Sequence, residues 1–94
     1  MPLSEIRKDI DAIDAKILSL LNRRFSLALR TRGFKSSPRD PVREREIQAG
    51  LKAKTADFPL LRAEFVLSLY ADILAESRRL QSQAGRIFKQ EKQP

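Results

Sequence analysis

Hydrophobic residues recur along the N-terminal third of the chain at the spacing of one helix face. Leucine or isoleucine stands at positions three or four residues apart, with one longer step at the end: Leu3, Ile6, Ile10, Ile13, Ile17, Leu20 and Leu27. No proline interrupts residues 3–35, and their only glycine is Gly33. Such steps align side chains in one stripe along an α-helix. The pattern predicts a first helix over about residues 3–35.

This first helix is too long to be covered by its own chain. A helix of about 32 residues would be roughly 48 Å long, whereas a compact monomer of this size has a radius of gyration of only about 12 Å. The apolar stripe therefore needs a second chain to bury it. We expect an oligomer, most simply a two-fold homodimer.

Weaker helical patterns follow along the rest of the chain. The segment SSPRDPV, residues 36–42, predicts a loop because two prolines stop the first helix. A second helix is predicted over 43–55, and a third over 59–85, with Pro59 suited to its first turn. The polar residues 86–94 would form a frayed tail. No strand pattern is present, so we expect one all-α domain spanning 1–94.

Polar residues interrupt the apolar stripe of each predicted helix. Arg24 falls at the skipped step of the first stripe, between Leu20 and Leu27, and Lys35, eleven residues further on, points the same way. Glu44 opens the inner face of the second helix, and Ser77 and Gln81 interrupt the third. A guanidinium in an apolar seam is costly unless an anion meets it. These residues therefore predict a shared polar site.

Another arginine, Arg7, flanks the stripe seventeen residues before Arg24, or roughly 25 Å along the helix axis. It cannot share a small site with Arg24 of its own chain, but in an antiparallel dimer the partner subunit's Arg7 could. The resulting pocket would hold two or three cations, one carboxylate and two neutral hydrogen-bonding groups. It suits a small dianion that also carries a hydroxyl, and its fixed charges could catalyse a unimolecular rearrangement.

Composition narrows the possible chemistry further. The 94 residues include no cysteine and no histidine, which excludes a thiolate nucleophile, a zinc finger and a histidine base. We expect no metal and no cofactor. The net charge of +7 fits either a nucleic-acid binder or a protein with a small polyanionic ligand. No long apolar run follows the N-terminus, so we expect a cytoplasmic protein with no membrane partner.

Four pieces of the chain carry a resemblance to a known family. They are IRKDIDAIDAKILSLLNRR, the pair Phe34-Lys35, REREI at 43–47 and ESRRLQ at 76–81. In this order they resemble the all-helical, AroQ-class (type II) chorismate mutases over about residues 3–84. The resemblance implies an intertwined homodimer of three-helix protomers. It also implies a cofactor-free isomerase that converts chorismate to prephenate by a Claisen rearrangement, in the shikimate pathway to aromatic amino acids.

The resemblance also implies roles for the polar residues in catalysis. Arg24 and the partner subunit's Arg7 would hold the substrate carboxylates. Lys35 and Gln81 resemble the pair that donates hydrogen bonds to the ether oxygen of the substrate. Glu44 matches the carboxylate that accepts a hydrogen bond from the ring hydroxyl.

Three further residues are assigned to substrate binding by the same resemblance. Ser77 matches a hydroxyl near a substrate carboxylate, and Arg43 lies beside Glu44. Asp40 could match an aspartate often found in the connector between the first two helices. That connector, between Lys35 and Arg43, is shorter here than in typical bacterial members, which leaves pocket closure and substrate preference open.

Simpler interpretations compete with these roles. Arg24 could extend from the seam into water, and Lys35 and Glu44 could simply complement helix dipoles. Arg43 could serve a structural ion pair, whereas Arg78 and Arg79 are expected to be solvated. Alternative functions also stay open: a 4-amino-4-deoxychorismate mutase, an isochorismate-pyruvate lyase, or a non-catalytic basic helical module. Because the basic residues are spread around the helices and no helix-turn-helix pattern is present, we expect no nucleic-acid partner.

Overall fold

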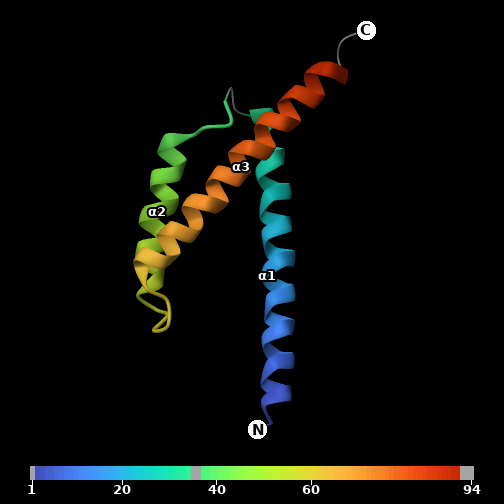
Figure 1. Ribbon diagram of the computed structural model, residues 1–94. Coiled ribbons are helices and arrows are strands. Elements are labelled where there is room, and N and C mark those ends of the chain that lie inside the picture. Colours follow the sequence, from blue (N-terminus) through green and yellow to red (C-terminus); the bar gives the residue numbers. More distant parts are fainter. Residues whose placement is uncertain (1, 35–36, 92–94) are drawn as a thin grey trace.

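The protein consists of helices joined by short connections. The computed structural model describes residues 2–34 and 37–91, with side chains for 2–34 and 37–84. The elements are α1 (Leu3–Thr31), the short 3-10 helix η1 (Arg32–Phe34), α2 (Pro41–Thr55) and α3 (Ala63–Glu91). Helix α3 contacts both other α-helices: α2 lies along its N-terminal half, and α1 crosses it near the C-terminal end of α1 (Figure 1). The described residues form no strand, which confirms the all-α prediction.

Helix α1 ends at Thr31, four residues before the predicted end at 35. The N–H of Arg32 donates to the carbonyl of Leu29, three residues back, and η1 continues this tighter 3-10 geometry. Such tightening is common at helix C-termini, and Gly33 is a poor helix former. Lys35 lies outside the described residues.

Helix α2 begins two residues earlier than predicted, at Pro41. Asp40 is its N-cap, and the Asp40 carboxylate accepts a hydrogen bond of 3.1 Å from the backbone N–H of Arg43. Proline is favoured in the first helical turn because its missing N–H would have no helical partner there. The sequence DPVR therefore starts the helix at its proline.

Helix α3 differs from its predicted bounds at both ends. Pro59 lies in a turn instead of the helix, because the N–H of Leu61 donates to the carbonyl of Phe58 at 3.0 Å. Proline suits the second position of such a turn as well as a first helical turn. At the other end α3 continues through Gly85 to Glu91. One glycine costs a helix only about 1 kcal/mol relative to alanine, too little to end it alone.

The small core of the described chain lies along one face of α3. Its buried apolar side chains are Val66, Ile73 and Leu74, and two polar side chains, Ser77 and Gln81, are buried with them. Ser77 and Gln81 were predicted to interrupt the apolar face of the third helix, and both lie on its buried face. Burying polar side chains in so small a core is costly unless they are hydrogen-bonded.

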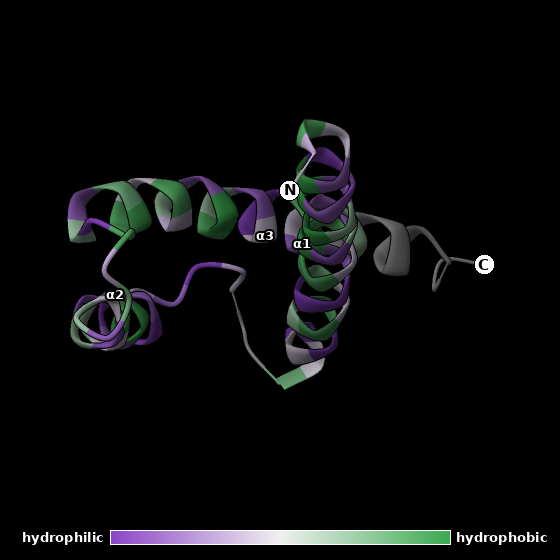
Figure 2. Cartoon of the chain, turned by 90° about the horizontal axis from the view of Figure 1, so that it is seen from below, coloured by the Kyte–Doolittle hydropathy of each residue, from purple (hydrophilic) through white to green (hydrophobic). Residues whose placement is uncertain are grey.

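Helix α1, in contrast, has no buried residue among its 29 residues. Its stripe residues Ile6, Ile10, Ile13 and Ile17 are between 41% and 56% exposed. Hydrophobic residues recur along α1 (Figure 2), and the N-terminal half of the helix extends away from α2 and α3 (Figure 1). The radius of gyration is 17.2 Å, well above the roughly 12 Å expected for a compact chain of this length.

Among the described residues, no helix combines the length and the apolar character needed to span a membrane.

Candidate active site

A cavity of about 320 Å³ opens between the C-terminal part of α1, the start of α2 and the middle of α3. Six of the eight predicted site residues line it, together with further polar and apolar side chains. The lining consists of Arg24, Leu27, Ala28, Thr31, Pro38, Asp40, Arg43, Glu44, Ile47, Leu74, Ser77, Arg78 and Gln81. Residues far apart in the sequence thus meet around one space large enough for a small molecule.

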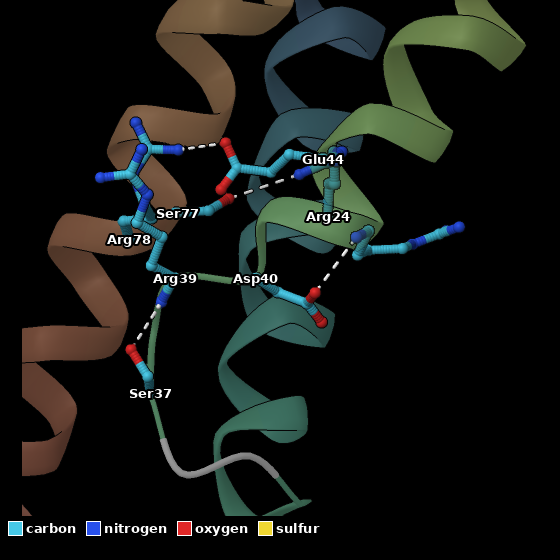
Figure 3. Close-up of polar contacts among 8 residues, drawn as sticks. Arg24, Ser37, Arg39, Asp40, Glu44, Ser77 and Arg78 are labelled. Atoms are coloured by element: carbon cyan, nitrogen blue, oxygen red, sulfur yellow. Dashed lines mark hydrogen bonds and ion pairs between the residues drawn. The ribbon is translucent and has the colours of Figure 1, made fainter.

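Arg24 reaches the cavity from α1. Its Nη1 donates a hydrogen bond of 3.3 Å to the hydroxyl oxygen of Ser77 on α3 (Figure 3). Its guanidinium carbon lies 5.7 Å from the centre of the Tyr70 ring, close enough for a cation–π attraction. Both contacts hold the half-buried guanidinium against α3 instead of letting it extend into water. The Arg24 guanidinium, which interrupts the apolar stripe of α1, is therefore part of the cavity.

Gln81 is held in the cavity wall by the end of α1. Because the N–H of Arg32 bonds to Leu29, the carbonyl of Ala28 is left without its usual helical donor. Two side chains donate to it instead: the Thr31 hydroxyl at 2.7 Å and the Gln81 amide nitrogen at 3.1 Å. The early end of α1 thus creates the acceptor that orients Gln81.

The other polar atoms of Gln81 remain available. The side chain is only 4% exposed, and its Oε1 atom is buried without a hydrogen-bond partner in the described part of the chain. One of the two amide hydrogens is used by Ala28, which leaves the second. A buried amide with unused hydrogen-bonding capacity costs free energy unless a ligand completes it.

The start of α2 supplies three charged groups to the cavity. The Asp40 carboxylate is occupied as the N-cap of α2, where it bonds the Arg43 backbone. One turn into the helix, Glu44 forms an ion pair with Arg78 of α3, between Glu44 Oε1 and Arg78 Nη1 (Figure 3). Both side chains are partly buried, so their mutual attraction is screened less than that of a surface pair.

Arg78 is the residue that sequence reasoning missed. We expected it to be solvated, whereas it lines the cavity and binds Glu44. A signal was present: Leu74, Ser77, Arg78 and Gln81 follow the three-and-four spacing of one helix face. Because Arg78 and Arg79 were grouped as two solvated neighbours, the position of Arg78 on the inner face of the helix was overlooked.

The neighbouring Arg79 behaves as expected for a surface residue. It pairs with Glu76 of the same helix, at a position that does not line the cavity. The hydrogen bond from Arg79 lowers the pKa of the exposed Glu76 carboxyl below its ordinary value. The two successive arginines of α3 therefore face different surroundings.

Arg7, one of the two remaining predicted residues, is not among the described residues that line the cavity. Arg7 is exposed on the N-terminal half of α1, well away from Arg24 on the same helix. Lys35 falls in the segment outside the described residues, between η1 and α2. The single chain therefore brings together Arg24, Asp40, Arg43, Glu44, Ser77 and Gln81, without Arg7.

The lining defines the chemistry that the cavity can support. The arginines of the lining favour an anionic ligand, Glu44 can accept from a hydroxyl, and Gln81 offers a neutral donor. Apolar side chains from all three helices complete the wall. With no histidine or cysteine in the sequence, binding and charge stabilisation are the means that this site offers.

Comparison with protein families agrees with this geometry. The model of the family described as chorismate mutase type II matches residues 6–82, which is most of the chain. The chain belongs to the chorismate mutase type II family. The matched segment of this chorismate mutase type II domain contains every predicted site residue. Comparisons with curated proteins and with solved structures found no match.

Proposed function

We propose that this protein is a chorismate mutase that converts chorismate to prephenate. The observation that carries the proposal is the cavity in which Arg24, Glu44, Ser77 and Gln81 converge from three helices, in a chain of this family. In the rearrangement one C–O bond breaks and one C–C bond forms within a single molecule. No atom enters or leaves, so the reaction requires neither a nucleophile nor a histidine.

The cavity residues fit the needs of this substrate. Arg24, braced by Ser77, binds a substrate carboxylate. The Oε2 atom of Glu44 accepts from the ring hydroxyl, since Arg78 occupies only Oε1. The second amide hydrogen of Gln81, with Lys35, donates to the ether oxygen. Negative charge grows on that oxygen as the C–O bond breaks, so fixed donors there bind the transition state more tightly than the substrate.

The proposal includes a homodimer. The exposed isoleucines of α1 form an apolar face that needs a cover, and pairing with a second α1 would bury it. In an antiparallel pair, the partner subunit's Arg7 would approach the end of α1 that carries Arg24. Each cavity would then gain one more cation for the second carboxylate of the dianion.

Loss of chorismate absorbance with purified protein tests the proposal, with prephenate identified as the product. The Arg24→Ala variant is expected to lose about 10²–10³-fold in kcat, as typically follows removal of one fixed donor. Arg79→Ala, which removes a guanidinium from the surface of α3, should keep its activity. Circular dichroism would verify that both variants fold. Unaltered protein that leaves chorismate intact would refute the proposal.

A further inference from the structure

The contact between Arg78 and Glu44 changes the charge that the cavity presents to a ligand. Among the described lining residues the carboxylates are Asp40 and Glu44, and Asp40 is engaged in capping α2. Glu44 is therefore the carboxylate best placed to receive a ligand donor, and Arg78 binds one of its two oxygens. The pair has no net charge, yet Oε2 can still accept a hydrogen bond.

A neutral pair of this kind distinguishes two kinds of donor. A hydroxyl needs only an acceptor atom, which Oε2 provides. An ammonium gains most from a carboxylate that has no other cation beside it. Here the Glu44 carboxylate already binds Arg78, so an ammonium at Oε2 would lie close to the Arg78 guanidinium and be repelled by it. Arg24 in the same lining adds to that repulsion. Like charges brought together in a partly buried site disfavour the wrong ligand.

We propose that Arg78 is a specificity-determining positioning residue, whose ion pair with Glu44 selects a substrate with a neutral hydroxyl at the ring carbon facing Glu44 and rejects one with an ammonium there. This inference rests on the proposed function, because it assumes that the cavity binds a chorismate-like ring. It concerns the two related substrates chorismate and 4-amino-4-deoxychorismate, which differ at that carbon.

The experiment compares both substrates in unaltered protein, Arg78→Met and Arg78→Lys, with kcat and KM measured separately. Arg78→Met removes the charge but keeps an unbranched side chain. We expect the ratio of kcat/KM for chorismate to that for the amino substrate to fall about tenfold or more, the effect of one unit charge close to an ammonium in a partly buried site. Arg78→Lys keeps the charge and should keep most of the preference.

Arg79→Met is the matched control, because it removes the adjacent guanidinium outside the cavity. Its substrate ratio should equal that of the unaltered protein. If Arg78→Met lowers kcat/KM for both substrates by the same factor, Arg78 is only structural and the inference is overturned. An unchanged ratio in a folded, active Arg78→Met protein overturns it equally.

Calorimetric binding of the same two compounds separates this inference from the proposed function. Turnover of neither compound by unaltered protein would refute the function. The ratio of the two Kd values in unaltered protein and in Arg78→Met would still test Arg78. A preference for chorismate that collapses in Arg78→Met supports the inference, and equal Kd ratios in the two proteins overturn it.

Discussion

At the scale of single residues, the unused hydrogen-bonding capacity of the Gln81 side-chain amide is the feature closest to the proposed chemistry. Gln81 is buried, one amide hydrogen is fixed on the Ala28 carbonyl, and Oε1 has no partner in the described chain. The amide is thus oriented before any ligand arrives. A donor held in place in this way does not have to reorganise when charge develops in the transition state.

Replacing Gln81 by leucine tests this role. The variant keeps a similar volume but loses the donor, so kcat should fall about 10²-fold or more. The Ala28 carbonyl keeps the Thr31 hydroxyl, so the free energy of unfolding should change by only about 1 kcal/mol. Steady-state kinetics and urea unfolding measure the two effects. Full activity in Gln81→Leu would contradict the assigned role.

Residue-scale prediction succeeded where a polar side chain broke an apolar pattern. Arg24, Ser77 and Gln81 were found in this way, because a polar group on a buried face needs a partner. Arg78 was missed because it was grouped with Arg79 as a solvated residue, although it continues the face of Ser77 and Gln81; its partner Glu44 lies on another helix. Local spacing places a residue on a face, but it does not show which charge stands opposite.

At the scale of elements, the N-cap of α2 positions Glu44. Asp40 bonds the Arg43 backbone and fixes the first turn, whose next residue is Glu44. A frayed first turn would move the Glu44 carboxylate relative to Arg78. The connector therefore acts on the site through the geometry of the helix start.

Two substitutions at Asp40 separate capping from direct binding. Asp40→Ala removes the cap and should cost about 1 kcal/mol of stability, with a lower kcat/KM because Glu44 shifts. Asp40→Asn keeps a good cap without the charge, and should retain stability and most activity. Thermal unfolding and kinetics on both variants provide the measurements. If Asp40→Asn loses as much activity as Asp40→Ala, the carboxylate charge itself acts on the ligand.

The exposed stripe of α1 gives a second prediction at this scale. Ile13 is 56% exposed in the single chain, and in the proposed dimer it would be buried. Ile13→Glu should therefore yield monomers, since it would place an unpaired charge in an apolar interface. Ala15→Glu adds the same charge on the opposite face of α1 and should leave the dimer intact. Light scattering after size-exclusion chromatography distinguishes the two outcomes.

At the scale of the whole molecule, the proposed site would be complete only in the proposed dimer. Arg7 and Arg24 stand at separate places along α1, and only Arg24 lines the cavity of its own chain. The two-fold arrangement predicts that each cavity combines Arg24 of one chain with Arg7 of the other. When one chain lacks Arg7 and its partner lacks Arg24, both defects would then fall in the same cavity and leave the other intact.

Mixing two inactive variants tests this arrangement. In a mixed dimer of Arg7→Ala and Arg24→Ala chains, one cavity has both arginines and the other has neither. After unfolding and refolding an equimolar mixture, half of the dimers should be mixed, so activity should return to about one quarter of the unaltered level. Each variant refolded alone is the control. No recovery of activity would contradict a shared site.

The sequence by itself determined the helical class, the three helices and most of the polar residues of the cavity. These features follow from local periodicity: apolar residues at three-and-four spacing form faces, and polar residues within those faces stand out. The spacing of the apolar residues also predicted the exposed stripe of α1, because a helix of that length cannot be covered by the rest of its own chain.

Only the tertiary structure decided where the helices end and which side chains meet. The last turn of α1 closes with a 3-10 hydrogen bond from the Arg32 N–H to the Leu29 carbonyl, which leaves the Ala28 carbonyl without its helical donor. That carbonyl orients Gln81 only because α3 packs against this end of α1. The Arg78 and Glu44 pair likewise joins two helices whose packing no local pattern specifies. Such contacts depend on three-dimensional distances between segments far apart in the chain, and helix periodicity carries no information about those distances.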